Sequence, residues 1–219
     1  MSPTCDLILP CRDEASALRA LLPRIPAGFG VLVVDNGSSD GTAGVAASLG
    51  ARVVCESSAG YGAAVHAGLL AATADLVAVM DGDGSFDPEE LQPLVADVAA
   101  GRADLAVGRR RPVTAGVWPW HARLGNALAL AWLRRRIGLT VHDIAPVRVA
   151  RRADLLALDV RDRLFGYPVE LLQKATDAGW RVVEHDVRYH PRAAGTRSKV
   201  SGSVRGTARA ARDFWRVLA

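Results

Sequence analysis

Two aspartates separated by one glycine, in the stretch VAVMDGDGSFDPEEL, are the residues of this sequence that most directly suggest chemistry. The apolar run before Asp81 is typical of a buried strand, and a strand that ends in bare carboxylates requires a compensating positive charge. Beyond the end of a strand, Asp81 and Asp83 can turn toward one point. Oxygen-only ligands at a partly open site suit Mg²⁺ or Mn²⁺ shared with a diphosphate. The alternative is a solvated acidic turn.

A third carboxylate follows another apolar run. In VLVVDNGSSDGT, Asp35 ends the run, and NGSSDG predicts a tight turn in which Asp40 can cap the next helix. A carboxylate fixed there can accept a hydrogen bond from the N–H of a uracil, a guanine or a similar base. The alternative is that Asp35 only caps the turn, because Asp-Asn-Gly is ordinary turn chemistry.

Short apolar runs alternate with helical patterns up to about residue 110. Strands are predicted at DLIL, GVLVVD, ARVVC, DLVAVMD and DLAVG, with helices that begin near Glu14, Asp40, Gly60 and Pro88. This order predicts an α/β fold with a mostly parallel sheet covered by helices. Ligands of such sheets bind beyond the carboxyl ends of the strands, so that edge is the expected place for a site.

Residues 111–219 are predicted to complete the same domain and to cover the site. A long helix is expected around Arg123 to Ile137, then a short element at APVRVA, two helical stretches, a strand at WRVVEHDV and a last helix. The 219 residues, half of them hydrophobic, suffice for one domain with a sizeable core.

The amino-acid composition indicates the kind of binding partner and the cellular compartment. The net charge of +4, from 27 basic and 23 acidic residues, favours an anionic partner without choosing between a nucleotide, a phospholipid and a nucleic acid. Three cysteines without C-x-x-C spacing argue against a disulfide frame or a zinc site and favour a reducing cytosol. No segment reaches the roughly 18 apolar residues needed to span a bilayer. We therefore expect a cytoplasmic protein.

Four ordered blocks, LILPCRDEA, VLVVDNGSSDGT, GYGAAVHAGLLAATADLVAVMDGDGSFDPEEL and DLAVGRRR, resemble glycosyltransferase family 2 enzymes with the GT-A fold, which is a single Rossmann-like domain. The C-terminal stretch RDRLFGYPVELLQKATDAGWRVVEHDVRYHPRAAGTRSKVSGS is similar to that of the dolichyl- or polyprenyl-phosphate mannosyl- and glucosyltransferases. The resemblance divides the domain into a nucleotide-sugar-binding half, residues 1–110, and an acceptor-binding half, residues 111–219.

The resemblance implies a metal-dependent, inverting transfer of a sugar from a UDP- or GDP-sugar to a polyprenyl phosphate, with no nucleic-acid partner. The residues implied in donor binding are Pro10, Arg12, Glu14, Asp35, Gly37 and Asp81. Those implied in binding Mg²⁺ or Mn²⁺ are Asp81, Asp83 and Ser85. Those implied in binding phosphate groups are Arg110, Arg192, Ser198 and Lys199. Arg123 and Arg148 are further candidates for binding the acceptor phosphate, because such an acceptor requires cations.

This chain departs from that branch at three points. Where the branch has D-A-D-L-Q, the chain has DGDGS, so the third metal ligand falls on Ser85. The shorter DIAPVR, residues 143–148, replaces D-x-x-S-G-F-R. In GTRSKV, one extra residue separates Gly195 from Ser198.

Charge development suggests how such a transfer is catalysed. Negative charge grows on the leaving diphosphate, and a divalent ion held by two aspartates neutralises it. A phosphate acceptor already offers an anionic oxygen at neutral pH, so it needs cations rather than a general base. A hydroxyl acceptor, in a small metabolite or a glycan, needs a base. Asp143 is the candidate for that catalytic role, and the alternatives for it are a helix cap or an arginine pair.

Two segments have amphipathic character. In SVRGTARAARDFWRVLA, apolar residues from Val204 to Leu218 run beside a row of arginines, which predicts a helix that lies on an anionic membrane or packs on the domain. The stretch WPWHARLGNALALAWL, residues 118–133, has more aromatic and apolar residues than one buried helix face needs. Both fit a peripheral position on the cytoplasmic face of the membrane.

Two functions of another class are alternatives. A sugar nucleotidyltransferase has a similar α/β architecture but needs a glycine-rich phosphate loop after the first strand, and this chain has PCRDEAS there. A non-catalytic nucleotide-sugar-binding module is the other possibility, and the intact Asp35, Asp81 and Asp83 argue against it.

Overall fold

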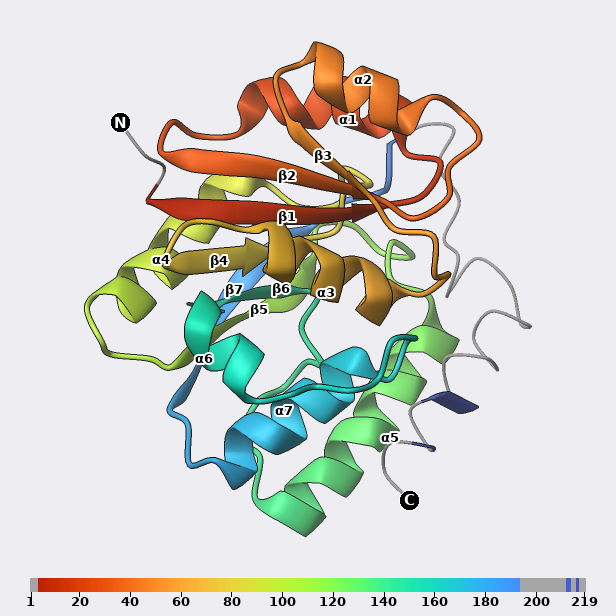
Figure 1. Ribbon diagram of the computed structural model, residues 1–219. Coiled ribbons are helices and arrows are strands. Elements are labelled where there is room, and N and C mark those ends of the chain that lie inside the picture. The colour runs from red at the N-terminus through yellow and green to blue at the C-terminus, as the bar shows by residue number, and fades with distance from the viewer. Residues whose placement is uncertain (1–3, 194–211, 214–215, 217–219) are drawn as a thin grey trace.

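The computed structural model describes residues 4–193, 212–213 and 216, and these contain one seven-stranded sheet (Figure 1). The strand order across the sheet is β3-β2-β1-β4-β6-β5-β7. The strands are β1 (Cys5–Cys11), β2 (Phe29–Asp35), β3 (Arg52–Cys55), β4 (Leu76–Val79), β5 (Leu105–Pro112), β6 (Val147–Arg151) and β7 (Val182–Tyr189). The chain thus forms the single, mostly parallel α/β domain that the sequence predicts.

The first four strands are parallel, and their pairing aligns their carboxyl ends. Asp35 at the end of β2 pairs with Cys11 of β1 and with Cys55 of β3. β4 lies on the other side of β1, with Val79 opposite Ile8. Each connection between these strands contains a helix, as parallel neighbours require. The residues that follow β1, β2 and β4 therefore meet at one edge of the sheet.

The second half of the chain inserts an antiparallel strand into this sheet. β6 lies between β4 and β5 and runs opposite to both. Because of this reversal, its second residue, Arg148, pairs with Val79 at the carboxyl end of β4. β7 then pairs in parallel with β5 as far as Tyr189 opposite Pro112. The residues after β7 are thus carried to the same edge.

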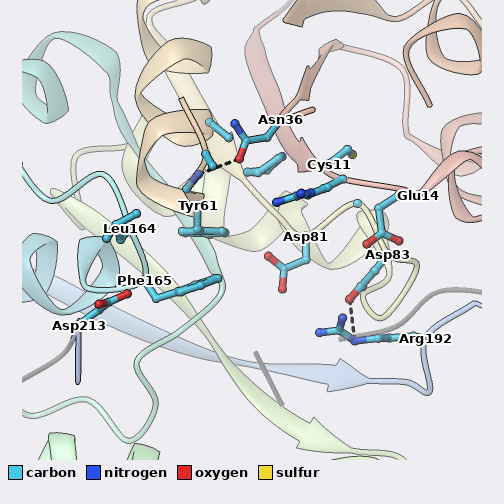
Figure 2. A pocket seen from close by; sticks show the side chains of 16 residues that line it. Cys11, Glu14, Asn36, Tyr61, Asp81, Asp83, Leu164, Phe165, Arg192 and Asp213 are labelled. Atoms are coloured by element: carbon cyan, nitrogen blue, oxygen red, sulfur yellow. Dashed lines mark hydrogen bonds and ion pairs between the residues drawn. The ribbon is translucent and has the colours of Figure 1, made fainter. Parts of the chain in front are cut away.

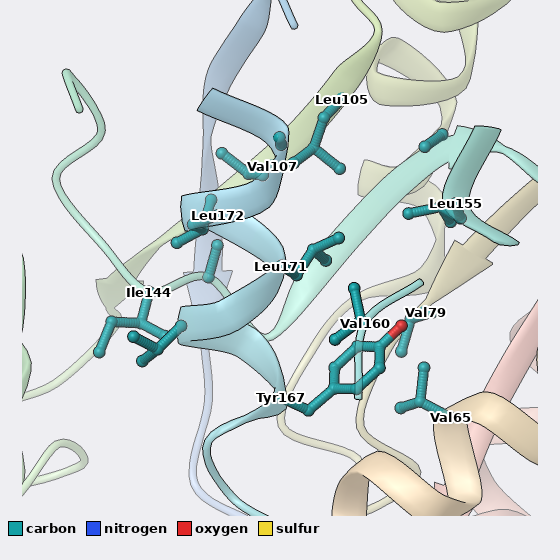
Figure 3. Close-up of a cluster of buried hydrophobic side chains, with 14 of the residues drawn as sticks. Val65, Val79, Leu105, Val107, Ile144, Leu155, Val160, Tyr167, Leu171 and Leu172 are labelled. Atoms are coloured by element: carbon teal, nitrogen blue, oxygen red, sulfur yellow. The ribbon is translucent and has the colours of Figure 1, made fainter. Parts of the chain in front are cut away.

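Helices cover both faces of the sheet and form two hydrophobic cores. Figure 3 shows one core, in which Leu171 and Leu172 lie toward the strand residues Leu105 and Val107. Tyr167 of the same core lies beside Val79 and Val160. This core lies under α3 (Tyr61–Ala71), α5 (Trp120–Ile137), α6 (Arg152–Ala157) and α7 (Tyr167–Asp177). The other lies under α1 (Ala15–Leu21), α2 (Thr42–Ser48) and α4 (Leu91–Ala99). Short 3₁₀ turns occupy Leu22–Arg24 and Pro88–Glu90.

The predicted elements of residues 4–193 are confirmed, and only their bounds shift. β5 continues beyond the predicted DLAVG as far as Pro112. α5 begins at Trp120 instead of near Arg123, because Pro119 is extended at the N-cap and the helix starts directly after it. The predicted last helix lies outside the described residues. Among the helices of the described residues, none combines the length and the apolar composition needed to cross a bilayer.

The two halves of the chain interlock at the start of α3. The backbone amides of Gly62 and Ala63 donate to the carbonyls of Leu164 (3.1 Å) and Arg163 (2.8 Å), so a loop of the second half caps this helix. The approach is so close that a Cβ on Gly62 would lie 2.5 Å from the carbonyl oxygen of Asp162. Glycine at position 62 is therefore a steric requirement.

We expect Gly62→Ala to lower the free energy of unfolding by about 1–3 kcal/mol, because the backbone of the capping loop has to move. Urea unfolding followed by circular dichroism measures this. The control is Gly44→Ala in α2, where no atom lies within 4 Å of the added Cβ. That variant should be neutral or slightly more stable. Equal stability of the two variants would contradict the steric argument.

Candidate functional site

A pocket of about 340 Å³ lies at the carboxyl edge of the sheet (Figure 2). It is bounded by the loops after β1, β2 and β4, the start of α3, the loop before α7 and the segment after β7. The residues that line it are Pro10, Cys11, Arg12, Glu14, Asn36, Ala59, Gly60, Tyr61, Ala64, Asp81, Gly82, Asp83, Leu164, Phe165, Arg192 and Asp213.

Asp81 and Asp83, the predicted carboxylate pair, both line this pocket. Figure 2 shows the Asp81 carboxylate directed into the open space, with Tyr61 on one side and Asp83 on the other. Gly82 separates the two because a Cβ at this position would lie 2.4 Å from the sulfur of Cys11. The D-G-D spacing thus follows from close packing of the loop on β1.

Asp83 is held from both sides and is 3% exposed. One carboxylate oxygen accepts the backbone N–H of Ser85 at 2.9 Å, and the other pairs with Nε of Arg192 at 2.9 Å. The segment that carries Arg192 is bound to the same loop, since the amide of Ala193 donates to the carbonyl of Asp83 (3.1 Å) and that of His190 to the carbonyl of Ser85 (2.9 Å). The loop that carries Asp83 and the segment that follows β7 are therefore held together.

The electrostatic environment of Asp81 is dominated by burial. Burial and the neighbouring charge of Asp83 raise the pKa of Asp81 from 3.8 to about 6, although Arg192, Arg148 and Arg110 act in the opposite direction. The negative charge at this point is thus only partly compensated by the protein. Such a site attracts a cation.

Arg148 supplies a buried positive charge beside the pocket. Its side chain comes from β6, it is 3% exposed, and it donates to the hydroxyl of Tyr61 at 3.2 Å. Its Nε has no hydrogen-bond partner among the residues that the structure describes. A guanidinium that is buried and incompletely paired suits an anionic ligand.

Arg110 pairs with Asp143, the residue considered as a base in the sequence. The guanidinium contacts the carboxylate twice (2.8 and 2.6 Å), the backbone N–H of Arg110 adds a third bond (2.9 Å), and Asp143 is fully buried. Asp143 is not among the residues that line the described pocket. The structure gives it the arginine-pairing role. Trp118 covers the same guanidinium at 4.1 Å.

Another part of the pocket is formed by residues at and after the ends of β1 and β2. Pro10, Arg12 and Glu14, the residues that the resemblance implies in donor binding, line it together with Asn36, which was not predicted. The side chain of Asn36 accepts from the amide of Gly60 (2.9 Å) and donates to the carbonyls of Glu56 and Ser58, so it fixes the loop before α3.

Several predicted residues do not reach the described pocket wall. Asp35 is 9% exposed and caps its turn through the amide of Ser38 (2.9 Å), while Gly37 is exposed at a positive φ of 78°. Ser85 is fully buried, and its hydroxyl has no partner among the described residues. Arg123 is exposed on α5. Ser198 and Lys199 lie outside the described residues.

Tyr61, Leu164 and Phe165 complete the pocket and were not predicted. The sequence signal for Tyr61 was the pair of glycines that flank it at the start of a helix, which permits close approach of another segment. Leu164 and Phe165 carry no local signal, because only the packing of their loop on α3 brings them to the site.

A mostly parallel α/β sheet with paired carboxylates at its carboxyl edge places the protein in the class of α/β proteins that bind a ligand beyond the ends of their strands. Comparison with known proteins narrows this class. The model of the family described as glycosyl transferase family 2 matches residues 6–157. The chain belongs to glycosyltransferase family 2 and is an enzyme of the hexosyltransferase type.

Curated relatives extend over almost the whole chain. A Mycobacterium tuberculosis glycosyltransferase described as uncharacterized is 58% identical and covers 97% of this chain and 96% of its own length. The polyprenol monophosphomannose synthase of Mycolicibacterium smegmatis is 35% identical over 90% of this chain and 81% of that protein. The undecaprenyl-phosphate mannosyltransferase of Micrococcus luteus is 32% identical, with coverage of 92% and 89%.

The fold also matches solved structures. Glucosyl-3-phosphoglycerate synthase from Mycobacterium tuberculosis, in complex with Mn²⁺, UDP and phosphoglyceric acid, superposes with a TM-score of 0.77. The match covers 99% of this chain and 77% of that protein, at 24% identity. At this identity the match establishes the GT-A fold.

We expect Asp81→Asn to stabilise the metal-free protein at pH 8 by about 1–2 kcal/mol, after allowance for the partial exposure of the side chain. Because the pKa of Asp81 is raised from 3.8 to about 6 on folding, the folded protein holds this proton more tightly than the unfolded chain. The native protein therefore loses stability as the pH rises from about 4 to 6, and the variant does not.

Thermal unfolding in EDTA at pH 4 and pH 8 measures the difference. The advantage of the variant should be present at pH 8 and absent at pH 4. Asp75→Asn is the matched control, since Asp75 is exposed just before β4. A variant that is less stable than the native protein at pH 8 would show that the Asp81 charge is compensated.

Proposed function

We propose that this enzyme transfers a hexosyl group from a nucleoside-diphosphate sugar to the phosphate of a polyprenyl phosphate at a membrane surface. The observation that carries this proposal is the set of arginines beside the paired carboxylates. Arg110, Arg148 and Arg192 all act on the charge of Asp81, and they come from three different strands or strand ends. Relatives that act on polyprenyl phosphates by name support this choice of acceptor.

The carboxylate pair is suited to a divalent cation. Asp81 and Asp83 face one pocket, and burial together with the neighbouring charge of Asp83 raises the pKa of Asp81. In the part of the chain that the structure describes, no group of three His, Cys, Asp or Glu side chains is placed to hold a metal ion. We propose that Asp81 and Asp83 are the two protein ligands, and that they would hold Mg²⁺ or Mn²⁺ together with oxygens of the donor diphosphate. Once bound, the ion would neutralise the charge of the leaving group.

The donor nucleotide is proposed to lie along the ends of β1 and β2. Pro10, Arg12 and Glu14 line this side, and Arg12 is exposed and available to a phosphate or a base. Asp35 and Gly37 are proposed to contact the base from the adjacent turn. Ser85 is proposed as a further ligand of the metal ion. Because its side chain is fully buried, its loop would have to turn to bring the hydroxyl to the ion.

The acceptor needs cations and not a base. A phosphate oxygen is already anionic, so it attacks the anomeric carbon without loss of a proton and displaces the diphosphate from the opposite face, with inversion. Arg192 and Arg148 are proposed to hold this phosphate. Arg110 contributes positive charge while Asp143 fixes its orientation. The arginine pair formed by Asp143 supports an acceptor that requires no base.

A phosphorylated small metabolite is the second candidate acceptor. The structural neighbour glucosyl-3-phosphoglycerate synthase was crystallised with phosphoglyceric acid, which is also an anion. The same arginines could bind such a molecule, but its reacting hydroxyl would have to lose a proton. The two acceptors are therefore distinguished by the need for a base.

The test is a transfer assay with a panel of UDP- and GDP-sugars, Mn²⁺ or Mg²⁺, and either a polyprenyl phosphate or phosphoglyceric acid. We expect metal-dependent transfer to the polyprenyl phosphate. Asp83→Asn should reduce turnover on the order of a hundredfold or more, because it removes a ligand of the ion that stabilises the leaving group. Asp75→Asn serves as the control. Transfer to phosphoglyceric acid alone, or wild-type turnover in Asp83→Asn, would overturn the proposal.

Arg192→Gln should raise the KM for the polyprenyl phosphate about 10- to 100-fold, since a charge-assisted contact contributes about 1.5–3 kcal/mol. Donor affinity, measured by calorimetry with UDP and Mn²⁺, should be unchanged or higher because Asp83 loses a competing cation. The control is Arg102→Gln, which removes an exposed arginine that pairs with Asp97. Weaker donor binding with an unchanged acceptor KM would assign Arg192 to the donor.

A further inference from the structure

Helix α5 exposes apolar side chains on its outer face. Trp120, Leu124 and Leu128 are 75%, 51% and 56% exposed, and they follow one another at four-residue intervals. Residues at this spacing lie on one side of a helix. Ala127 and Ala131, both exposed, fall on the same side. This outer face of α5 is defined here by Trp120, Leu124, Ala127, Leu128 and Ala131.

The opposite side of α5 is already used for packing. Ala129, Leu130 and Leu133 are buried in the core shared with α7, and Asn126 accepts a hydrogen bond from the amide of Ile144 at 3.0 Å. In Figure 1, α5 lies at the margin of the molecule beside α7. A helix that is apolar on both sides requires a second partner, because an ordinary surface helix is polar on its outer side.

The charges on α5 indicate the nature of that partner. The helix has no acidic residue, and its exposed arginines are Arg123, Arg134, Arg135 and Arg136. Arg135 continues the outer face, at four residues from Ala131. From Trp120 to Arg135 the face is about 22 Å long. An apolar face on a helix whose only charged side chains are arginines complements an anionic lipid surface, with Trp120 at the depth of the headgroups. Pairing with the same face of a second copy would bring arginines together without an acid on either helix.

The outer face begins next to the arginine side of the site. Trp118, two residues before α5, lies 4.1 Å over the guanidinium of Arg110. A lipid whose phosphate lies at the arginines would therefore meet the bilayer on the side where α5 starts.

We propose that the outer face of α5 is a docking surface for an anionic lipid bilayer. This inference rests on the proposed function, because an enzyme whose acceptor is a lipid phosphate has to meet that acceptor at a membrane. Binding of the protein to vesicles can be measured separately from sugar transfer, because it needs no substrate.

The test is sedimentation of the full-length protein with vesicles of phosphatidylglycerol and phosphatidylcholine (3:7), in the absence of donor, metal and acceptor. We expect the triple variant Trp120→Ser/Leu124→Ser/Leu128→Ser to bind at least tenfold more weakly than the native protein. Leu70→Ser is the matched control, because Leu70 is an equally exposed leucine, 59%, on α3. It should bind as the native protein does. Pure phosphatidylcholine vesicles should bind the native protein weakly.

Circular dichroism and the Tm establish that the variants are folded, since only exposed side chains are changed. Equal vesicle binding by the triple variant and the native protein would overturn the proposal, as would failure of the native protein to bind. A native dimer that becomes monomeric in the triple variant, without vesicle binding, would identify the face as a subunit interface and also overturn it. Vesicle binding without transfer to a polyprenyl phosphate would leave the docking surface standing and contradict the proposed function alone.

Discussion

The burial of two neighbouring carboxylates in one pocket is the constraint on which the rest of the site depends. Asp81 and Asp83 are kept together because Gly82 packs on Cys11, and burial and the charge of Asp83 raise the pKa of Asp81 in spite of the arginines nearby. Arg192 neutralises one of them at 2.9 Å. The folded protein is therefore less stable than it would be without the Asp81 charge, and a bound cation would remove this loss of stability. Active sites are often destabilised in this way, because function requires the residues that cause it.

The sheet topology makes this charge balance possible. An entirely parallel order would direct the amino end of β6 away from the site. The antiparallel insertion of β6 instead places Arg148 beside Val79, at the carboxyl end of β4. The parallel pairing of β7 with β5 carries Arg192 to the same edge. Positive charges from distant parts of the sequence thus converge on acids from the first half of the chain.

The same constraint connects the site to the surface of the molecule. Arg110 is oriented by the buried Asp143 and covered by Trp118, and α5 begins two residues later. The inner side of α5 is fixed by packing on α7, so the direction of its apolar outer face is fixed as well. A lipid phosphate and a lipid surface would then be recognised by adjacent parts of one structure.

The sequence by itself determined the strands of the sheet, the α/β class and the location of Asp81 and Asp83, because these follow from local features: an apolar run, a turn and a carboxylate. Only the tertiary structure decided which charges pair. Asp83 meets Arg192 and Asp143 meets Arg110 through strand registers that no local pattern encodes. For the same reason Asn36 and Tyr61 were missed, and Ser85 was expected at a pocket wall that its buried side chain does not reach. Local spacing predicts backbone conformation, whereas side-chain partners depend on segments that meet only after the sheet has formed.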